Sequence, residues 1–154
     1  MTTGKSINAD IGFSYGLVWG WLHLTNQRYG SMPTGEMQIA LTIVMLNKLG
    51  FDPTVTDLTE ITNLPKSNVS RYVSGQMAKG VLEEYIDSSD RRRRKLRPSQ
   101  KAGPELIWFE KHVRKIYDLV HEQQQKGETT SRDFNILLEN LRAITDRIIT
   151  NATN

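Results

Sequence analysis

The chain of 154 residues is 38% hydrophobic and 24% charged, which is the composition of an ordinary globular protein and not of a disordered chain. It contains no cysteine, which excludes disulfides and thiolate metal sites. The net charge of +3 is unevenly distributed, because residues 66–101 hold ten Lys and Arg against four Asp and Glu (+6), whereas the remainder holds ten against thirteen (−3). Such a regional basic patch is the electrostatic footprint of a nucleic-acid-binding surface, and a merely solvated surface is the alternative.

The first predicted element is a helix over residues 7–29. Its apolar positions fit a helical period and also an alternating strand, so the period alone leaves both open. Gly12, Gly16 and Gly20 recur every four residues, which on a helix forms a flat ridge that another helix can approach closely. Each glycine costs about 1 kcal/mol of helix stability against alanine, so packing must hold the segment. Its aromatic residues are expected at an interface between subunits or else in the core: Phe13, Tyr15, Trp19 and Trp21.

The N-terminal sequence lacks the charged and apolar regions of a secretory signal. The longest apolar run, residues 11–24, is too short to span a bilayer. We therefore expect a cytoplasmic protein with no membrane partner.

A second helix is predicted over residues 35–49. Thr34 follows a proline and can cap its N-terminus, and Gly50 can end it. The helical period predicts an apolar stripe that faces the core, formed by Met37, Ala40, Leu41, Val44 and Met45.

Two short helices follow at residues 56–62 and 65–79, separated by only a tight turn. Asn63 stands in this turn, where a residue that tolerates positive φ is needed, and Gly80 ends the second helix. This is the spacing of a helix-turn-helix.

The second of these helices has two contrasting faces. On a helical wheel Val69, Tyr72, Val73, Gln76 and Met77 fall within one arc, which we expect to face the core. The opposite arc holds one arginine among very small residues, so the helix backbone can approach base edges in a groove about 12 Å wide. A solvent-exposed amphipathic helix without a partner is the alternative. The residues of this helix that we expect to contact DNA are Lys66, Ser67, Asn68, Ser70, Arg71 and Ser74.

Residues 81–87 and 93–97 are predicted to form two strands joined by a turn at 88–91. Pro98 ends the second strand, because proline cannot donate to a ladder, and Leu96 is expected to face the core. The composition also allows a nuclear-localisation signal, but such signals favour flexible exposed segments. The hairpin residues that we expect to contact DNA are Asp90, Arg91, Arg92, Arg93 and Arg94.

Two further helices are predicted over residues 99–126 and 133–150, each with apolar residues at helical spacing. The predicted order is therefore four helices, a hairpin and two helices. This order makes the fold class mainly α with a small β-hairpin.

Residues 54–102 resemble the winged helix-turn-helix of the MarR (multiple antibiotic resistance regulator) family. The resemblance rests on short motifs in a fixed order: LTEI at 58–61, KSNVSR at 66–71, KGVLE at 79–83, DRR at 90–92 and SQKA at 99–102. The flanking helices match the family in order and length.

The resemblance implies a winged helix-turn-helix DNA-binding domain at residues 35–100, flanked by dimerisation helices at residues 1–34 and 101–154. It further implies a homodimeric, sequence-specific transcriptional regulator, a repressor, that binds an inverted-repeat operator in double-stranded DNA. The recognition helix would enter the major groove and the arginine-rich wing the minor groove. In the wing, Asp90 would orient Arg92, or else Arg91, toward the minor groove.

We expect no enzyme, metal site or cofactor, because no phosphate-binding glycine loop or nucleophile motif is present and the three histidines lack ligand spacing. The alternative function is a winged-helix architectural or interaction module that binds the DNA backbone without sequence preference. MarR-like regulators often bind a small aromatic effector. The residues that could line such a pocket, or else pack in the core, are Trp19, Trp21, Trp108 and Phe109.

Overall fold

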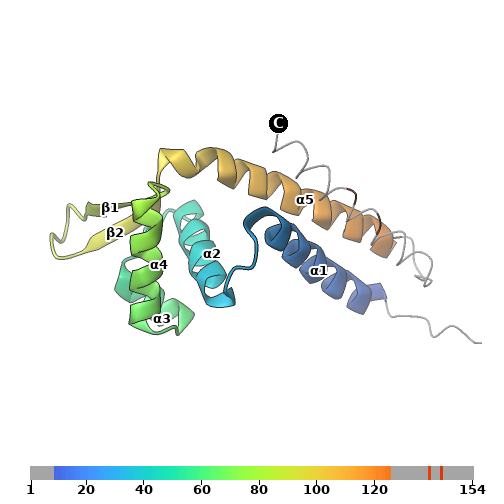
Figure 1. The fold of residues 1–154 in the computed structure, drawn as a ribbon, viewed down its shortest axis with the longest axis horizontal. Coiled ribbons are helices and arrows are strands. Elements are labelled where there is room, and N and C mark those ends of the chain that lie inside the picture. Colours follow the sequence, from blue (N-terminus) through green and yellow to red (C-terminus); the bar gives the residue numbers. More distant parts are fainter. Residues whose placement is uncertain (1–8, 126–138, 140–142, 144–154) are drawn as a thin grey trace, which may run out of the picture. The chain divides into compact units, whose positions relative to one another are not determined.

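The computed structural model describes residues 9–125, 139 and 143 (Figure 1). The helix predicted over residues 133–150 therefore lies outside the described residues, apart from those two positions. The chain divides into two compact units. Unit 1 comprises the residues up to Ser31 together with those from Trp108 onward, and unit 2 comprises Met32–Ile107.

The described elements confirm a mainly α fold with a small β-hairpin. The long helix predicted from residue 99 is divided into a single 3-10 turn and a helix that begins in unit 2 and continues in unit 1. In chain order the elements are α1 (Ala9–Tyr29), α2 (Thr34–Lys48), α3 (Val55–Thr62), α4 (Lys66–Ala78), β1 (Leu82–Ile86), β2 (Arg94–Pro98), η1 (Gln100–Ala102) and α5 (Gly103–Gln125).

Unit 2 has one hydrophobic core to which α2, α3, α4 and both strands contribute. Three of its side chains, Leu58, Val69 and Leu96, have no exposed surface. The expectation that Leu96 faces the core is therefore confirmed. Full burial of an aliphatic side chain of this size stabilises a fold by about 1.5–3 kcal/mol. The buried core residues are Ile39, Ile43, Leu58, Val69, Val73, Leu82 and Leu96.

The predicted inner face of α2 is partly wrong, because Ala40 and Val44 are half-buried but Leu41 and Met45 are exposed. Met37 is buried as expected, but the other buried apolar residues are Ile39 and Ile43, whereas Leu41 and Met45 are 39% and 55% exposed. Apolar residues occur around most of this helix, so the helical period could not select the face that packs on α3 and α4.

The N-termini of α2 and α3 are made differently. The expected cap Thr34 is instead the first residue of α2, after Pro33, and no side chain caps this helix. At α3, the Oγ1 of Thr54 accepts a hydrogen bond from the Asp57 amide (3.1 Å), and the Asp57 carboxylate accepts one from the Thr54 amide (2.8 Å). This reciprocal capping box starts α3 at Val55, one residue earlier than the sequence predicts.

The turn between α3 and α4 contains the residue that was expected to adopt positive φ. Asn63 has a φ of 55° and is the one non-glycine residue in the left-handed region among those described. Asparagine enters this region more readily than most residues. The chain can therefore turn within Asn63, Leu64 and Pro65, which brings α3 and α4 into the compact arrangement of a helix-turn-helix.

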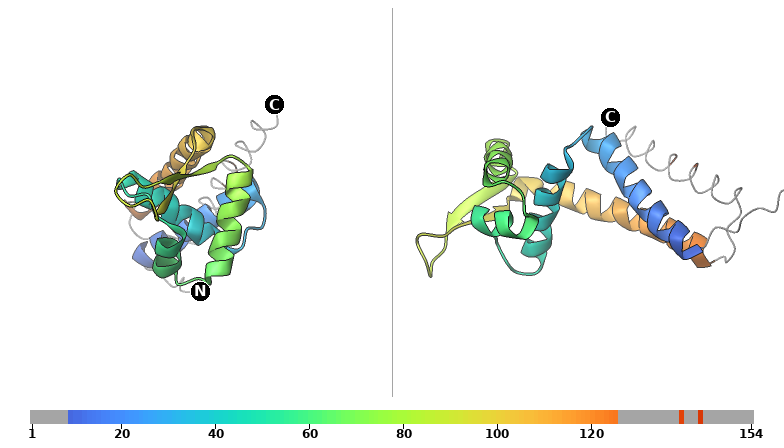
Figure 2. Two further views of the ribbon diagram at one scale, coloured as in Figure 1. Left: turned by 90° about the vertical axis from the view of Figure 1, so that its left-hand side faces the viewer. Right: turned by 90° about the horizontal axis from the view of Figure 1, so that it is seen from below.

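The two strands form an antiparallel hairpin in which Leu82 lies opposite Pro98 and Ile86 lies opposite Arg94. Pro98 is the last residue of β2, as predicted. On its other side β2 contacts the segment before α3, because the Leu96 amide donates to the Pro53 carbonyl oxygen at 2.8 Å. The base of the hairpin is thus bonded to the segment before α3, while its tip extends beyond α3 and α4 (Figure 1; Figure 2).

In unit 1, α1 and α5 lie alongside each other and bury Leu24, Ile116 and Val120 between them (Figure 2). α1 is one continuous helix, so of the two interpretations left open by the apolar positions, the helix is confirmed and the strand is wrong. Gly16 and Gly20 of its glycine ridge are buried. None of the helices in the described part of the chain is long and apolar enough to cross a membrane.

The capping box gives a first testable prediction. Changing Thr54 to alanine removes the side-chain acceptor for the Asp57 amide and should lower the free energy of unfolding by about 1 kcal/mol. Urea unfolding of the full chain, followed by circular dichroism, measures this change. Thr56→Ala is the matched control, because Thr56 is an exposed residue inside the same helix and alanine is the better helix former. Equal unfolding midpoints for Thr54→Ala and the native chain would contradict the capping role.

Candidate nucleic-acid interface

The outward face of α4 consists of small and polar side chains, and its inner face is anchored by two buried valines. Val69 and Val73 are 0% and 3% exposed and hold the helix on the core. Gly75 and Ala78 extend the outward face without bulk. Among the described residues no carboxylate pairs with the cations of this face. Of the residues predicted to contact DNA, Ser70 is half-buried and the others are exposed: Lys66, Ser67, Asn68, Arg71 and Ser74.

The inner face of α4 is narrower at its C-terminal end than the sequence predicts. Tyr72 is half-buried against the core, and this burial, together with the nearby charge of Glu36, raises the pKa of its hydroxyl to about 12. Met77, which was expected to face the core, is 38% exposed. The core therefore holds α4 mainly through its first two turns.

The two ends of α4 differ in how their backbone groups are satisfied. Pro65 is the N-cap and provides no side-chain cap. The Asn68 amide donates to the Pro65 carbonyl oxygen at 2.9 Å, so the amides that remain available to an anion are those of Lys66 and Ser67. At the C-terminal end, Lys101 Nζ donates to the Lys79 carbonyl oxygen (2.9 Å) and Ser99 Oγ donates to that of Gly80 (2.6 Å). Only the N-terminal end, where the helix dipole is positive, is open to a ligand.

Four of the six cations in residues 91–97 are paired with carboxylates of the protein. Three of the pairs are on the surface, whereas the Asp87 carboxylate of the fourth is buried. A surface ion pair contributes roughly 0–1 kcal/mol, so the three exposed contacts matter mainly because they direct the side chains. Arg97 also lies over the Tyr85 ring, and its hydrogen bond to Glu83 raises the pKa of its guanidinium. The pairs are Arg93–Asp57 (3.3 Å), Arg94–Glu84 (2.8 Å), Lys95–Asp87 (3.1 Å) and Arg97–Glu83.

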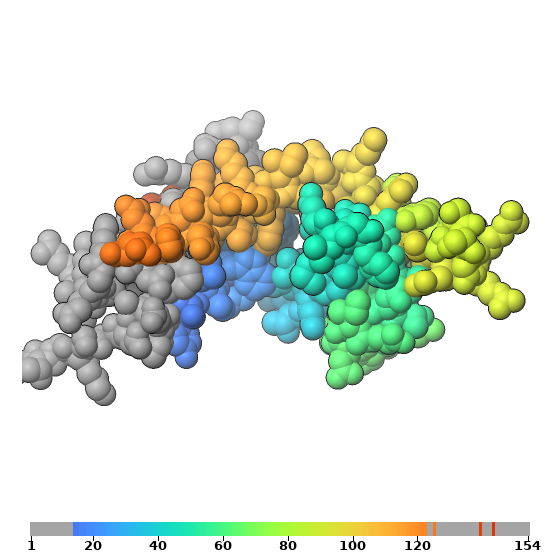
Figure 3. Space-filling model, turned by 180° about the vertical axis from the view of Figure 1, so that it is seen from behind, coloured from blue at the N-terminus to red at the C-terminus, as the bar shows by residue number. Residues whose placement is uncertain are grey.

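Arg91 and Arg92 are the two remaining cations, and both are exposed at the tip of the hairpin. No hydrogen bond or ion pair with another described residue engages either guanidinium group. The tip projects beyond the surface formed by α3 and α4 (Figure 3). These two positive charges are therefore accessible to an external partner.

Two aspartates build the turn that carries these arginines. The Asp87 carboxylate accepts hydrogen bonds from the Ser89 amide (3.0 Å) and hydroxyl (2.9 Å), and it also pairs with Lys95. The Asp90 carboxylate accepts one from the Arg92 backbone amide (3.0 Å). Asp90 thus contacts the backbone of Arg92, and that it orients the Arg92 side chain toward a minor groove stays a prediction.

The sequence reasoning missed the four acidic partners of the hairpin cations. Glu83 and Glu84 stand on the first strand, where an antiparallel register brings them beside the basic second strand, so charge alternation across a hairpin was an available signal. Asp87 directly precedes the predicted turn, and an aspartate at such a position is typical of an Asx turn. Asp57 lies 36 positions before Arg93, and no local pattern connects the two.

The aromatic residues predicted to line an effector pocket all belong to unit 1. Trp19 and Trp108 pack against its core, and Trp19 stacks on His23 with ring centroids 5.0 Å apart. Trp108 contacts the guanidinium of Arg28 at 4.3 Å and the ring of His112 at 4.4 Å. Core packing accounts for the half-burial of these tryptophans, and an effector pocket stays a prediction.

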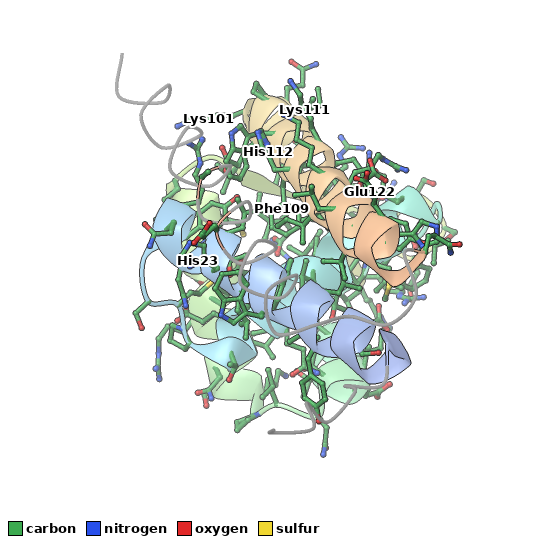
Figure 4. The ribbon with its side chains drawn as sticks, turned by 90° about the vertical axis from the view of Figure 1, so that its right-hand side faces the viewer. His23, Lys101, Phe109, Lys111, His112 and Glu122 are labelled. Atoms are coloured by element: carbon green, nitrogen blue, oxygen red, sulfur yellow. The ribbon has the colours of Figure 1, made fainter. Side chains whose placement is uncertain are left out.

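The remaining two candidates, Trp21 and Phe109, are half-buried. Figure 4 shows Phe109 and His112 on α5 and His23 on α1. Within the described residues, no group of three or more His, Asp or Glu side chains is arranged to hold a metal ion.

The geometry at Asp87 predicts an acidic titration. Hydrogen bonds from the Ser89 amide and hydroxyl and from Lys95 lower the pKa of the carboxyl from 3.8 to about 2. Because this pKa is lower in the folded chain than in the unfolded one, the contribution of Asp87 to stability is complete above about pH 4 and is lost as the pH falls toward 2. An NMR titration of the Asp87 carboxyl carbon should give a pKa near 2.

Asp87→Asn should accelerate amide exchange of Ser89 at neutral pH. The difference between the variant and the native chain should shrink as the pH falls through about 2, because the native carboxyl becomes protonated over this range. A measured pKa near 4, the ordinary value for aspartate, would contradict these contacts.

No family model and no curated protein matches the sequence. The fold, however, is similar to solved structures of transcriptional regulators. The transcriptional regulator PA4135 has 14% identity and a TM-score of 0.55, with 86% of this chain and 90% of that chain covered. A MarR-like transcriptional regulator from Thermotoga maritima has 18% identity and a TM-score of 0.50, with 92% and 97% covered. A variant of MepR from S. aureus, bound to an oligodeoxyribonucleotide, has 14% identity and a TM-score of 0.51, with 88% and 91% covered.

Identities of this size establish a likeness of fold. From α1 to α5, the order of the helices and the position of the hairpin after the helix-turn-helix agree with the order expected from the sequence. This chain has the winged helix-turn-helix fold of the MarR-like transcriptional regulators.

Proposed function

We propose that the protein is a transcriptional regulator, a repressor, that binds double-stranded DNA as a homodimer. The observation that carries the proposal is the outward face of α4, which combines small exposed side chains with Arg71 and Lys66. A helix with such a face can lie in a major groove without holding its backbone away from the bases. The solved structure of a MepR variant with an oligodeoxyribonucleotide, which has the same fold, supports this choice of partner.

In this proposal α4 is the recognition helix. Its first turns would contact bases and phosphates, with Arg71 suited to a guanine edge and Lys66 to a phosphate beside the helix N-terminus. The remaining contacts would come from the short polar side chains Ser67, Asn68, Ser70 and Ser74. The uncapped first turn supports a phosphate at this end of the helix.

The hairpin would be the wing that enters the adjacent minor groove. Arg91 and Arg92 support this role because they are exposed at the tip. Arginine is well suited to a narrow minor groove, where the negative potential is enhanced. Arg93 and Arg94 carry charges that are already compensated by Asp57 and Glu84, so they would add less to the affinity.

The homodimer is supported by an apolar stripe on α1. Tyr15, Val18 and Leu22 follow helical spacing and are 73%, 55% and 39% exposed. Large apolar side chains exposed side by side are typical of interaction surfaces. Two copies related by a twofold axis would present two recognition helices, and the operator would then be an inverted repeat.

The operator can be identified by selecting bound duplexes from a random pool. We expect an inverted repeat with half-site centres about one helical turn apart. Fluorescence anisotropy on the selected duplex should show affinity that falls steeply with salt, with a slope of about 0.9 for each phosphate contact. Absence of binding at low salt would exclude the proposal.

Replacing Arg71 with alanine tests whether α4 reads sequence. If Arg71 contacts a base, Arg71→Ala should cost about 1–3 kcal/mol on the operator and relax the preference at one base pair. Arg114→Ala is the matched control, because it removes the same charge from α5 in unit 1, where Arg114 pairs with Glu110. Equal weakening by Arg71→Ala on every duplex, with no preferred sequence for the native chain, would instead identify an architectural module that binds only the DNA backbone.

A further inference from the structure

Arg93 joins the tip of the hairpin to α3. Its amide donates to the Asp90 carbonyl oxygen (2.9 Å), and its own carbonyl oxygen accepts from the Asp87 amide (3.0 Å). Its guanidinium Nη2 reaches back to the Asp57 carboxylate at 3.3 Å. Arg93 is thus bonded to the tip through its backbone and to the helix-turn-helix through its side chain.

The other attachments of the hairpin lie closer to its base. The Leu96 amide bonds to Pro53, and the Tyr85 hydroxyl donates to an Asp52 carboxylate oxygen at 2.6 Å. Beyond Arg93, the hydrogen bonds and ion pairs found in the described chain connect tip residues only with one another or with the strands. The Arg93–Asp57 pair is therefore the outermost contact between the hairpin and α3.

Asp57 is a fixed partner for this arginine. Its carboxylate is held by the Thr54 amide at 2.8 Å as part of the capping box. Partial burial by itself would raise the pKa of Asp57, but the hydrogen bonds with Thr54 and the charge of Arg93 lower it below the ordinary value. The carboxylate is thus charged at neutral pH, and it cannot follow Arg93 without breaking the cap of α3.

We propose that Arg93 is a positioning residue whose ion pair with Asp57 fixes the hairpin tip, and with it Arg91 and Arg92, relative to the helix-turn-helix. The consequence for DNA binding rests on the proposed function. Arg93 would then serve the wing without itself being a principal DNA contact. Arg91 and Arg92 would engage DNA from a tip that is already oriented, which reduces the entropy lost on binding.

The Asp57→Asn variant distinguishes two effects on DNA affinity: loss of the contact that positions the hairpin tip, and loss of a negative charge. Asparagine keeps an oxygen that can accept from the Thr54 amide, but it removes the negative charge that holds Arg93. Loss of a negative charge should by itself strengthen attraction to DNA. If Asp57 positions the hairpin tip, the variant should instead bind the operator more weakly, by about two- to fivefold, which is the effect expected from one exposed ion pair. Glu60→Gln is the matched control, because Glu60 is exposed on the same helix, and it should leave affinity unchanged or slightly higher.

A second comparison distinguishes positioning from a general loss of stability. When Arg91 and Arg92 are both replaced by alanine, no tip cation remains to be positioned, so adding Asp57→Asn should cause no further weakening. A general loss of stability would weaken both backgrounds equally, and that result would overturn the proposal. Arg93→Gln should behave like Asp57→Asn without adding to it, and Arg93→Lys should retain most of the affinity.

Hydrogen exchange on the DNA-free protein tests the same contact independently of DNA. The amides of Asp87 and Arg93, which are bonded within the tip, should exchange faster in Asp57→Asn and Arg93→Gln than in the native chain and Glu60→Gln. Unchanged exchange would overturn the positioning role. If the native chain bound no duplex, the proposed function would fail, and faster exchange would still establish that Asp57 holds the tip.

Discussion

The burial of one leucine governs the geometry of the basic hairpin. Leu96 is fully buried although its sequence neighbours, Lys95 and Arg97, are both charged. Side chains alternate between the two faces of a strand, so a slip of one residue would carry one of these cations into the core. A buried charge without a partner costs several kcal/mol, which makes that register inaccessible.

Once this register is set, the positions of the charges follow from it. Glu83 lies opposite Arg97, and Tyr85 lies opposite Lys95. Arg94 is then close enough to Glu84 to form an ion pair, and the chain reverses through the turn held by Asp87. The hairpin is therefore much less basic as a surface than its sequence suggests, and its uncompensated charge is concentrated at one end.

Most of the architecture could be predicted from the sequence because local rules determine it. The turn at Asn63 follows from the residue types that tolerate positive φ, and the inward direction of Leu96 follows from strand alternation. The inner face of α2 could not be predicted, because Leu41 and Ile43 are equally apolar and only the packing of α3 and α4 distinguishes them. The same holds for Asp57 and Arg93, which meet only after the chain has folded. For the interface, residue types predicted which side chains are exposed on α4, while their contacts with DNA stay predictions.

The distribution of aromatic residues has a consequence for spectroscopy. All three tryptophans, Trp19, Trp21 and Trp108, belong to unit 1, and unit 2 contains none. Intrinsic tryptophan emission is therefore a selective reporter of the α1–α5 pair, in which Trp108 contacts Arg28 and His112. The helix-turn-helix and the hairpin contain no tryptophan and do not contribute to this emission. A change in emission when a ligand binds would therefore report a change in the surroundings of the tryptophans in unit 1.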